Sequence, residues 1–157
     1  MRCELTFDNQ FYCCTYTIKK DHANTYALFI ITPHIYGCEK ILEAQWKCDE
    51  AKGAGYDFNK EDMIPLFCEY EKEAYIETFK EKLIDFIRIK KTNKDLYEFT
   101  LQYQFLPKHT NTILKSLQKN ETLKVIDIES GKNARKNSFY VNYKNYKNRV
   151  YIEYVKK

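Results

Sequence analysis

The chain has 157 residues, of which 44% are hydrophobic and 31% are charged. This length and balance predict a globular protein with one ordinary domain, or with two small domains that share a core. They exclude a collagen-like or disordered chain, and no apolar run approaches the ~18 residues of a membrane span. The first 20 residues contain no continuous apolar stretch, so we expect no signal peptide and a cytoplasmic location.

The formal net charge of +4 is unevenly distributed along the chain. Residues 1–129 contain 18 Lys and Arg against 21 Asp and Glu, whereas residues 130–157 contain eight Lys and Arg against Glu153 alone. A basic segment of this kind attracts phosphate groups through its field and through counterion release. Because 22 of the 26 basic residues are lysines, passive solvation of the surface is an alternative interpretation.

Cysteine and histidine do not occur at spacings typical of metal sites. No two cysteines have the C-x-x-C spacing of zinc ligands, and the three histidines are scattered, so we expect no metal site and no cofactor. Without a secretory signal, disulfides are not expected, and free cysteine is commonly a small buried hydrophobic residue. We therefore expect inert core thiols at Cys3, Cys13, Cys14, Cys38, Cys48 and Cys68.

The first 60 residues predict strands followed by one helix. Residues 2–7 and 11–18 are rich in β-branched and aromatic side chains and predict two strands with turn residues between them. The continuous apolar run at 26–31 predicts a strand covered on both faces, which would be the most buried strand of the chain. Beyond Pro33, apolar residues at helical spacing predict an amphipathic helix over 35–48, and the glycines that follow predict a loop.

The rest of the chain predicts a long helix and then the element order of a winged helix. Residues 69–91 predict a charged amphipathic helix. Its apolar face is formed by Tyr75, Ile76, Phe79, Leu83, Phe86 and Ile87. The later segments are, in order, a short apolar segment at 95–103, a turn at 104–107, a helix at 108–119, a strand at 123–128, a basic loop at 129–148 with a further strand at 139–143, and a closing strand at 150–155.

The expected fold class is therefore α+β. Residues 1–60 are predicted to form a small antiparallel sheet with a packed helix, and residues 61–157 a long helix plus a winged-helix-like module. The strands at 11–18 and 26–31 would leave uncovered edges, so we expect a homo-oligomer.

The predicted helix-turn-helix and basic loop supply candidate contacts to nucleic acid. In a winged helix the second helix of the motif lies in the major groove and the wing lies along the backbone. Lysines and hydroxyls suit phosphate contacts, and Asn111 is suited to a base edge. The tyrosines interleaved in the loop could stack on unpaired bases or fill a half-buried sheet, and protein docking is a further alternative for this module. The candidate residues are Lys108, Asn111, Thr112, Lys115, Lys119, Lys132, Arg135, Lys136, Lys144, Lys147 and Arg149.

His34 is the best single candidate for chemistry. It follows the apolar strand at its C-terminal end, where open sheets place ligands. No serine, cysteine or carboxylate at a short fixed spacing completes a catalytic set, so we assign no catalytic residue. The alternative is that His34 caps the backbone of the helix that follows.

Residues 28–49, LFIITPHIYGCEKILEAQWKCD, resemble the strand–helix signature of the three-Cys-motif partner proteins. The similarity continues through FLPKHTN at 105–111 and LKSL at 114–117, and covers about residues 10–155. Within the first stretch, the residues that carry the resemblance are Thr32, His34, Gly37, Lys40, Trp46 and Asp49.

This resemblance implies a methyltransferase-like part followed by a winged-helix-like segment, and a radical-SAM-like partner that carries a three-cysteine motif. The glycine-rich turn that would bind S-adenosylmethionine in such a protein does not occur in this chain. What the chain resembles is only the last strands of the methyltransferase-like sheet together with the C-terminal module. We therefore expect one of three origins for this sequence. It is the product of a truncated gene, an excised segment of a longer protein, or a protein that pairs with a separately encoded half.

The function that these features favour is a non-catalytic accessory protein that contacts the backbone of DNA or RNA, and this chain alone is not expected to be an enzyme. One alternative is the C-terminal part of a methyltransferase-like enzyme that acts only with a missing or separately encoded methyltransferase-like half. Another is a subunit that docks other proteins.

Overall fold

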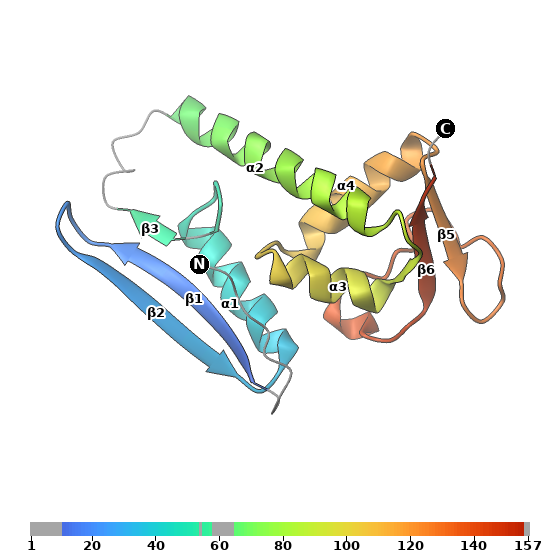
Figure 1. Cartoon of the computed structure of the whole chain (residues 1–157), viewed down its shortest axis with the longest axis horizontal. Coiled ribbons are helices and arrows are strands. Elements are labelled where there is room, and N and C mark those ends of the chain that lie inside the picture. The colour runs from blue at the N-terminus through green and yellow to red at the C-terminus, as the bar shows by residue number, and fades with distance from the viewer. Residues whose placement is uncertain (1–10, 54, 58–64, 156–157) are drawn as a thin grey trace. The chain divides into compact units, whose positions relative to one another are not determined.

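The computed structural model describes residues 11–53, 55–57 and 65–155 (Figure 1). The chain divides into two compact units. Unit 1 consists of residues 1–77 and 101–106, and unit 2 of residues 78–100 and 107–157. Along the described chain, no helix combines the length and the apolar content needed to cross a membrane.

Unit 1 contains a three-stranded sheet in the order β2-β1-β3, formed by β1 (Tyr12–Lys19), β2 (Thr25–Thr32) and β3 (Gly55–Asp57). β1 and β2 pair antiparallel, whereas β3 pairs parallel with β1, so the sheet is mixed. The two predicted strands at 11–18 and 26–31 are confirmed, and β3 lies in the stretch that was predicted as loop. The predicted strand at 2–7 lies outside the described residues.

Helix α1 (Ile35–Cys48) packs against this sheet and confirms the predicted helix. Pro33 follows β2, and its fixed φ and missing N–H are compatible with the change from strand to helix. Gly37 lets the first turn of α1 approach the end of β2, because a Cβ on Gly37 would stand 2.3 Å from Oγ1 of Thr32. The side chains that α1 buries in unit 1 are Ile35, Cys38, Leu42, Gln45 and Trp46.

Trp46 is the centre of an aromatic cluster in unit 1. Its ring centroid lies 6.4 Å from that of Tyr75 and 5.6 Å from that of Phe105, and its Nε1 donates to the carbonyl of Gln104 at 2.9 Å. Gly53 has a φ of +60°, and a Cβ there would stand 2.7 Å from the indole. Trp46 therefore anchors the helix end in the core of the unit.

The prediction that β2 is the most buried strand is wrong. Tyr26, Phe29 and Ile31 are 52%, 60% and 66% exposed, and the buried residues of the sheet are Cys14 and Tyr16 of β1. The reason is topological: β1 is the central strand, while β2 is at the edge of the described sheet. An apolar run shows that a strand can be covered on both faces, but it does not give the position of that strand in the sheet.

The hydroxyl of Tyr16 is buried without a hydrogen-bond partner among the described residues. Burial raises the pKa of this hydroxyl, and the neighbouring Cys48 thiol raises it further. Because removing an unpaired buried polar group is nearly neutral or stabilising, Tyr16→Phe is expected to leave the free energy of unfolding unchanged or to raise it by up to about 1 kcal/mol. Urea denaturation measures this change.

The matched control for this prediction is Tyr146→Phe. The Tyr146 hydroxyl donates to the carboxylate of Glu98, so its removal should lower the free energy of unfolding by about 1 kcal/mol or more. A loss of stability in Tyr16→Phe as large as in Tyr146→Phe would contradict the prediction.

Unit 2 contains the helix-turn-helix and a second three-stranded sheet. Its sheet has the order β4-β6-β5 and is antiparallel throughout. The predicted helices and strands at 108–119, 123–128 and 150–155 are confirmed, and the apolar segment at 95–103 is a helix. The elements are the last turns of α2 (Pro65–Phe86), β4 (Lys91–Thr92), α3 (Asn93–Gln102), α4 (Pro107–Lys119), β5 (Leu123–Asp127) and β6 (Val150–Tyr154).

The long predicted helix is α2, although it begins at Pro65 and ends at Phe86 rather than covering 69–91. On the predicted apolar face Phe79 and Leu83 are buried, as is Ile87 directly after the helix. Tyr75, Ile76 and Phe86 are half-buried. The ring of Phe86 stacks on Phe99 of α3 with centroids 4.1 Å apart. These contacts join α2 and α3 in the core of unit 2.

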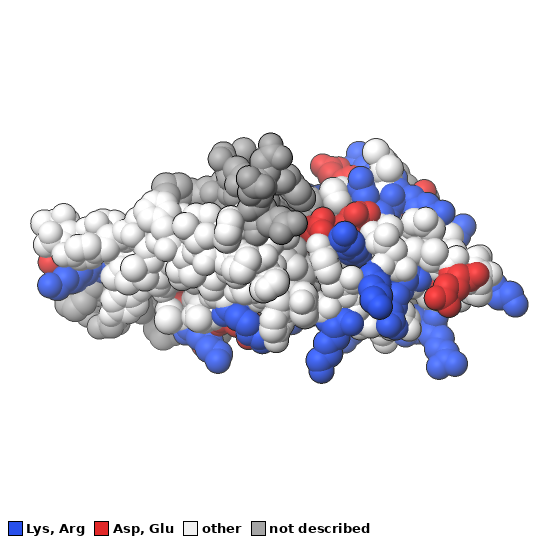
Figure 2. Space-filling view, turned by 90° about the horizontal axis from the view of Figure 1, so that it is seen from below, with Lys and Arg blue, Asp and Glu red and all other residues white. Residues whose placement is uncertain are grey.

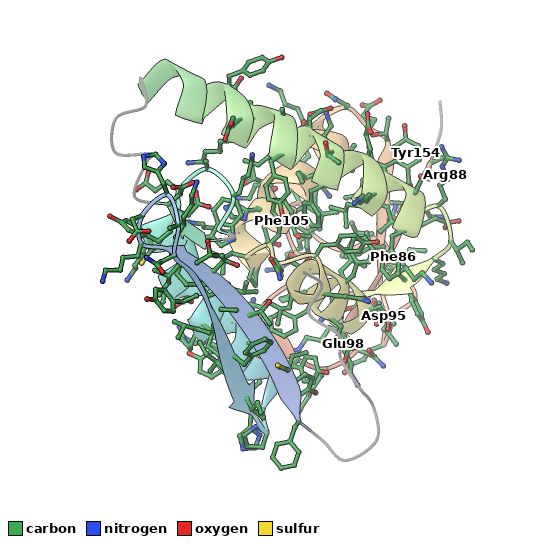
Figure 3. All side chains as sticks on the ribbon, turned by 60° about the vertical axis from the view of Figure 1, so that its left-hand side comes forward. Phe86, Arg88, Asp95, Glu98, Phe105 and Tyr154 are labelled. Carbon is green, nitrogen blue, oxygen red and sulfur yellow. The ribbon has the colours of Figure 1, made fainter. Side chains whose placement is uncertain are left out.

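The start of α3 has a capping box. The Thr92 amide donates to the Asp95 carboxylate at 2.9 Å, and the Asp95 amide donates to the Thr92 hydroxyl at 3.1 Å, so two otherwise unpaired N–H groups are satisfied. Figure 3 labels Asp95 and Glu98 along this helix. Further along, the hydroxyls of Thr100 and Thr110 lie 2.6 Å apart, which pairs two buried polar groups between α3 and α4.

The described residues do not form the predicted strand at 139–143. Tyr140 has a φ of +55°, in the left-handed region, which is incompatible with a continuous strand. Phe139 and Val141 are nevertheless buried, and Tyr143–Asn145 form a short 3₁₀ helix. The apolar residues that favoured a strand are therefore anchors of an irregular loop.

Candidate nucleic-acid interface

One side of α4 is exposed and basic. Pro107 occupies the first position of the helix, where its missing N–H costs nothing. The opposite side buries Ile113, Leu114 and Leu117, as the periodicity predicts. The exposed side carries four of the predicted contact residues at intervals of four, three and four positions, namely Lys108, Thr112, Lys115 and Lys119. The helix therefore presents three cations along a single face.

The loop after β5 begins with a tight hairpin, which we call the wing hairpin (residues 123–134). The Asp127 amide donates to the Lys132 carbonyl at 2.9 Å and the Ala134 amide to the Val125 carbonyl at 2.9 Å, so the chain returns along β5. At the tip, the Asp127 carboxylate accepts from the amide and the hydroxyl of Ser130, both at 2.8 Å. These bonds lower the pKa of Asp127 and fix the turn.

The cations of this region are exposed. Lys132 lies next to the tip of the wing hairpin, and Arg135 and Lys136 follow it directly. Figure 2 shows Lys and Arg side chains gathered over the surface of unit 2, with fewer Asp and Glu among them. The basic character of residues 130–157 lies on the surface of the unit, because the following cations are all exposed: Lys132, Arg135, Lys136, Lys144, Lys147 and Arg149.

Asn93 holds the later part of the basic loop against α3. Its side chain is 1% exposed. Its Nδ2 donates to three carbonyls of the loop, those of Tyr140 at 3.3 Å, Asn145 at 3.0 Å and Lys147 at 2.9 Å.

The Oδ1 of Asn93 also accepts hydrogen bonds from the loop. The amide of Arg149 donates to it at 2.8 Å and the amide of Val150 at 3.2 Å. One buried amide therefore fixes the backbone of the segment that carries Lys144, Lys147 and Arg149, all of which are exposed. Sequence reasoning missed Asn93, because an asparagine after a capping threonine is an ordinary helix-start residue and nothing local marks its distant partners.

Asn111 ties α4 to the same loop. Its Nδ2 donates to the Val141 carbonyl at 3.1 Å, and the Asn137 amide donates to Oε1 of Gln118 at 2.9 Å. Asn111 and Lys115 also line an open pocket of about 290 Å³ with loop residues 137–142. The side chain proposed for a base edge thus has a structural bond as well as a place in this pocket.

The three interleaved tyrosines have different environments. Tyr146 packs edge-on against Tyr97 with centroids 5.4 Å apart and donates to Glu98, so it is a structural residue. Tyr143 stacks on Tyr146 at 6.2 Å and keeps an exposed ring. Tyr140 is also exposed, and the guanidinium of Arg149 lies 5.6 Å from its ring centroid. Exposed ring surface is therefore found on Tyr140 and Tyr143.

His34 lies in unit 1, just before α1. Its amide donates to Oγ1 of Thr32 at 3.3 Å and its carbonyl accepts from the Gly37 amide at 2.8 Å, whereas its side chain makes no capping bond to the helix. The suggestion that the imidazole caps α1 is wrong, because the backbone of His34 makes these contacts instead.

The described residues include no group of three or more His, Cys, Asp and Glu side chains that could hold a metal ion. Among the cysteines, Cys14 and Cys38 are buried as predicted, and Cys13 is only half-buried. Cys48 is exposed, so the expectation of a core thiol is wrong there. It is the last residue of α1, where the helix surface faces solvent. Cys3 lies outside the described residues, and the side chain of Cys68 is not described.

Residues 55–128 match the model of a family described as GMT-like wHTH domain, and this range is just under half of the chain. Searches of curated proteins and of solved structures found no significant match. The matched range includes β3, α2, β4, α3, α4 and β5, and the structure adds β6 between β4 and β5. The helix-turn-helix, the wing hairpin and the family match together show that the chain contains a winged helix-turn-helix domain.

Proposed function

We propose that the protein is a non-catalytic accessory protein that binds the backbone of DNA or RNA through unit 2. The observation that carries this proposal is the row of Lys108, Lys115 and Lys119 on the exposed side of α4, the helix that enters the major groove in winged helices. A winged helix-turn-helix domain is compatible with such binding.

The basic loop supports the same function. Because Asn93 and Asn111 bind its backbone, the segment that carries Lys144, Lys147 and Arg149 has a fixed backbone before a ligand binds. A preorganised loop loses less conformational entropy on binding, which favours affinity. The exposed rings of Tyr140 and Tyr143 add stacking surface for an unpaired base.

The chemistry of these side chains favours positioning over sequence reading. Bidentate recognition of guanine is commonly made by arginine, and the exposed face of α4 carries lysines instead. Lysine to phosphate contacts fix orientation but carry no sequence information. We therefore expect affinity that depends strongly on salt and only weakly on sequence.

The experiment is a salt series of binding to short duplex and single-stranded DNA and RNA, with the full chain and with the variant Lys108→Gln/Lys115→Gln/Lys119→Gln. Each phosphate contact to duplex DNA contributes about 0.9 to the slope of log K against log salt, so the variant should lose a slope of about 3. The loss should be similar for unrelated sequences.

The matched control removes the same number of charges from exposed lysines of unit 1, in Lys20→Gln/Lys40→Gln/Lys47→Gln. It should keep the slope of the unmodified chain. Equal effects of the two variants would mean that net charge alone attracts the nucleic acid, and no binding at low salt would favour a protein-docking role for the winged helix instead.

The finer relationship to three-Cys-motif partner proteins stays a prediction. Its signature lies at residues 28–49, outside the range of the family match. The chain is proposed to act with a separately encoded methyltransferase-like half or with a radical-SAM-like partner. Because residues 28–49 belong to unit 1, unit 1 is the part in which contacts to such a partner should be sought. The purified chain alone should then show no thermal shift with S-adenosylmethionine, because only a ligand bound to the native state stabilises it.

A further inference from the structure

The outer edge of β2 lacks the features that normally prevent strand association. Residues 25–32 contain no charged side chain and no proline. No described strand pairs with this edge, since β1 occupies the other side of β2. Natural edge strands are usually short, charged or interrupted, because free N–H and C=O groups template pairing with another chain.

Both faces of β2 expose apolar side chains. Leu28 and Ile30 lie on the face toward α1, and Phe29 and Ile31 lie on the opposite face, and all four are at least 37% exposed. A strand that is apolar on both faces is typical of the interior of a sheet. Alone at an edge, β2 leaves in water the apolar surface that an interior strand would bury.

An apolar groove runs between β2 and α1 on the first of these faces. It has a volume of about 380 Å³ and is lined by Leu28 and Ile30 of β2, Tyr16 of β1, and Ile41 and Ala44 of α1 among others. A strand added beside β2 would direct every second side chain toward this face of the sheet. Such a strand would cover Leu28 and Ile30. It would also form hydrogen bonds with the N–H and C=O groups at the outer edge of β2.

We propose that β2 pairs antiparallel with β2 of a second copy of this chain, which gives a continuous sheet in the order β3-β1-β2-β2-β1-β3. A two-fold axis perpendicular to the sheet relates the copies and keeps both α1 helices on one face, so that the two grooves adjoin. The interface is isologous and closes after two copies. This inference does not depend on the proposed function.

The composition of β2 favours a second copy as the occupant. Self-pairing places each side chain near its own counterpart, which is destabilising when the strand is charged. β2 has no charges to oppose each other, and its apolar residues meet apolar residues on both faces. Because cross-strand partners share a face, residues of equal parity pair, and near full overlap puts Phe29 opposite or diagonal to Phe29 of the other copy.

The test is sedimentation equilibrium of the full chain over a concentration series without nucleic acid. The unmodified chain should form a dimer, and Phe29→Lys and Phe29→Glu should each raise the dimer dissociation constant at least tenfold. Since Phe29 is mostly exposed, neither change should unfold the monomer, which circular dichroism checks. Mixing the two variants should restore dimers, because the opposite charges then face each other.

Thr17→Lys is the matched control. Thr17 is exposed on the same face of the sheet as Phe29 but belongs to the central strand, so a lysine there should leave the dimer intact. A monomer at all concentrations would overturn the proposal, as would a dimer that survives both Phe29 variants. Failure of the mixture to recover dimers would also overturn it, since it would place Phe29 away from the two-fold axis.

Discussion

Asn93→Leu should lower the free energy of unfolding by roughly 3–5 kcal/mol, the largest effect expected of any single substitution considered. The side chain makes five hydrogen bonds to loop backbone groups and is almost fully buried. Each lost bond costs about 0.5–1.5 kcal/mol, and groups that stay buried without a partner cost more. Leucine has a similar volume, so the change removes the hydrogen bonds without leaving a large cavity.

Urea denaturation measures this loss, and hydrogen exchange shows where it arises. The amides of Arg149 and Val150 donate to Asn93, so their exchange should accelerate more than that of the Tyr154 amide, which donates to the Ile87 carbonyl. Asn148→Leu is the control, because Asn148 is an exposed residue of the same loop and should change stability by no more than about 0.5 kcal/mol. A loss below 1 kcal/mol in Asn93→Leu would show that the loop is not held by this side chain.

The part of the fold that periodicity describes could be predicted from the sequence. Apolar residues at helical spacing predicted α1 and α4, and alternation predicted β6, because each of these elements buries one side against its own unit. The two-residue strand β4 is too short to have a pattern. The segment at 139–143 has strand composition but not strand geometry, since Tyr140 takes a positive φ that its apolar neighbours do not reveal.

Burial depends on topology, and topology is the part that the sequence did not determine. Residues 26–31 are as apolar as an interior strand, yet β2 is an edge strand of the described sheet. The same limit applies to Asn93, whose partners lie 47 to 57 residues away along the chain. A single sequence contains no local signal for contacts at that separation.

For the candidate interface, the exposed lysines of α4 and of the loop could be predicted because charge and amphipathic spacing are local. The hydrogen bonds and ring contacts that hold these segments in place could not be predicted. Asn111 was predicted as a contact to a base edge, and its amide donates to the Val141 carbonyl. The predicted tyrosines also divide, since Tyr146 is bound to Glu98 whereas Tyr140 and Tyr143 are exposed. The path of the loop over α3 and α4 determines which of these side chains make structural contacts and which are exposed. The sequence does not show that path.

Neutralising three cations of α4 together with three at the end of the basic loop should lower the slope of log K against log salt by about 5, and the remaining slope should come from other exposed cations such as Lys132, Arg135 and Lys136. The six-residue variant combines Lys108→Gln, Lys115→Gln and Lys119→Gln with Lys144→Gln, Lys147→Gln and Arg149→Gln. If all six cations contact phosphates, the affinity of the unmodified chain for duplex DNA should fall by on the order of 10³ between 50 and 200 mM salt. The affinity of the variant should be weaker at both salt concentrations and should change far less between them.

The two three-residue variants divide this effect between the helix and the loop. Each should remove a slope of about 3, and their effects should add, because phosphate contacts at separate positions release separate counterions. A loop variant that leaves the slope unchanged would confine the interface to α4. In that case the bonds from Asn93 and Asn111 would serve the packing of unit 2 alone, and Asn93→Leu would change stability without changing the affinity of the folded protein for nucleic acid.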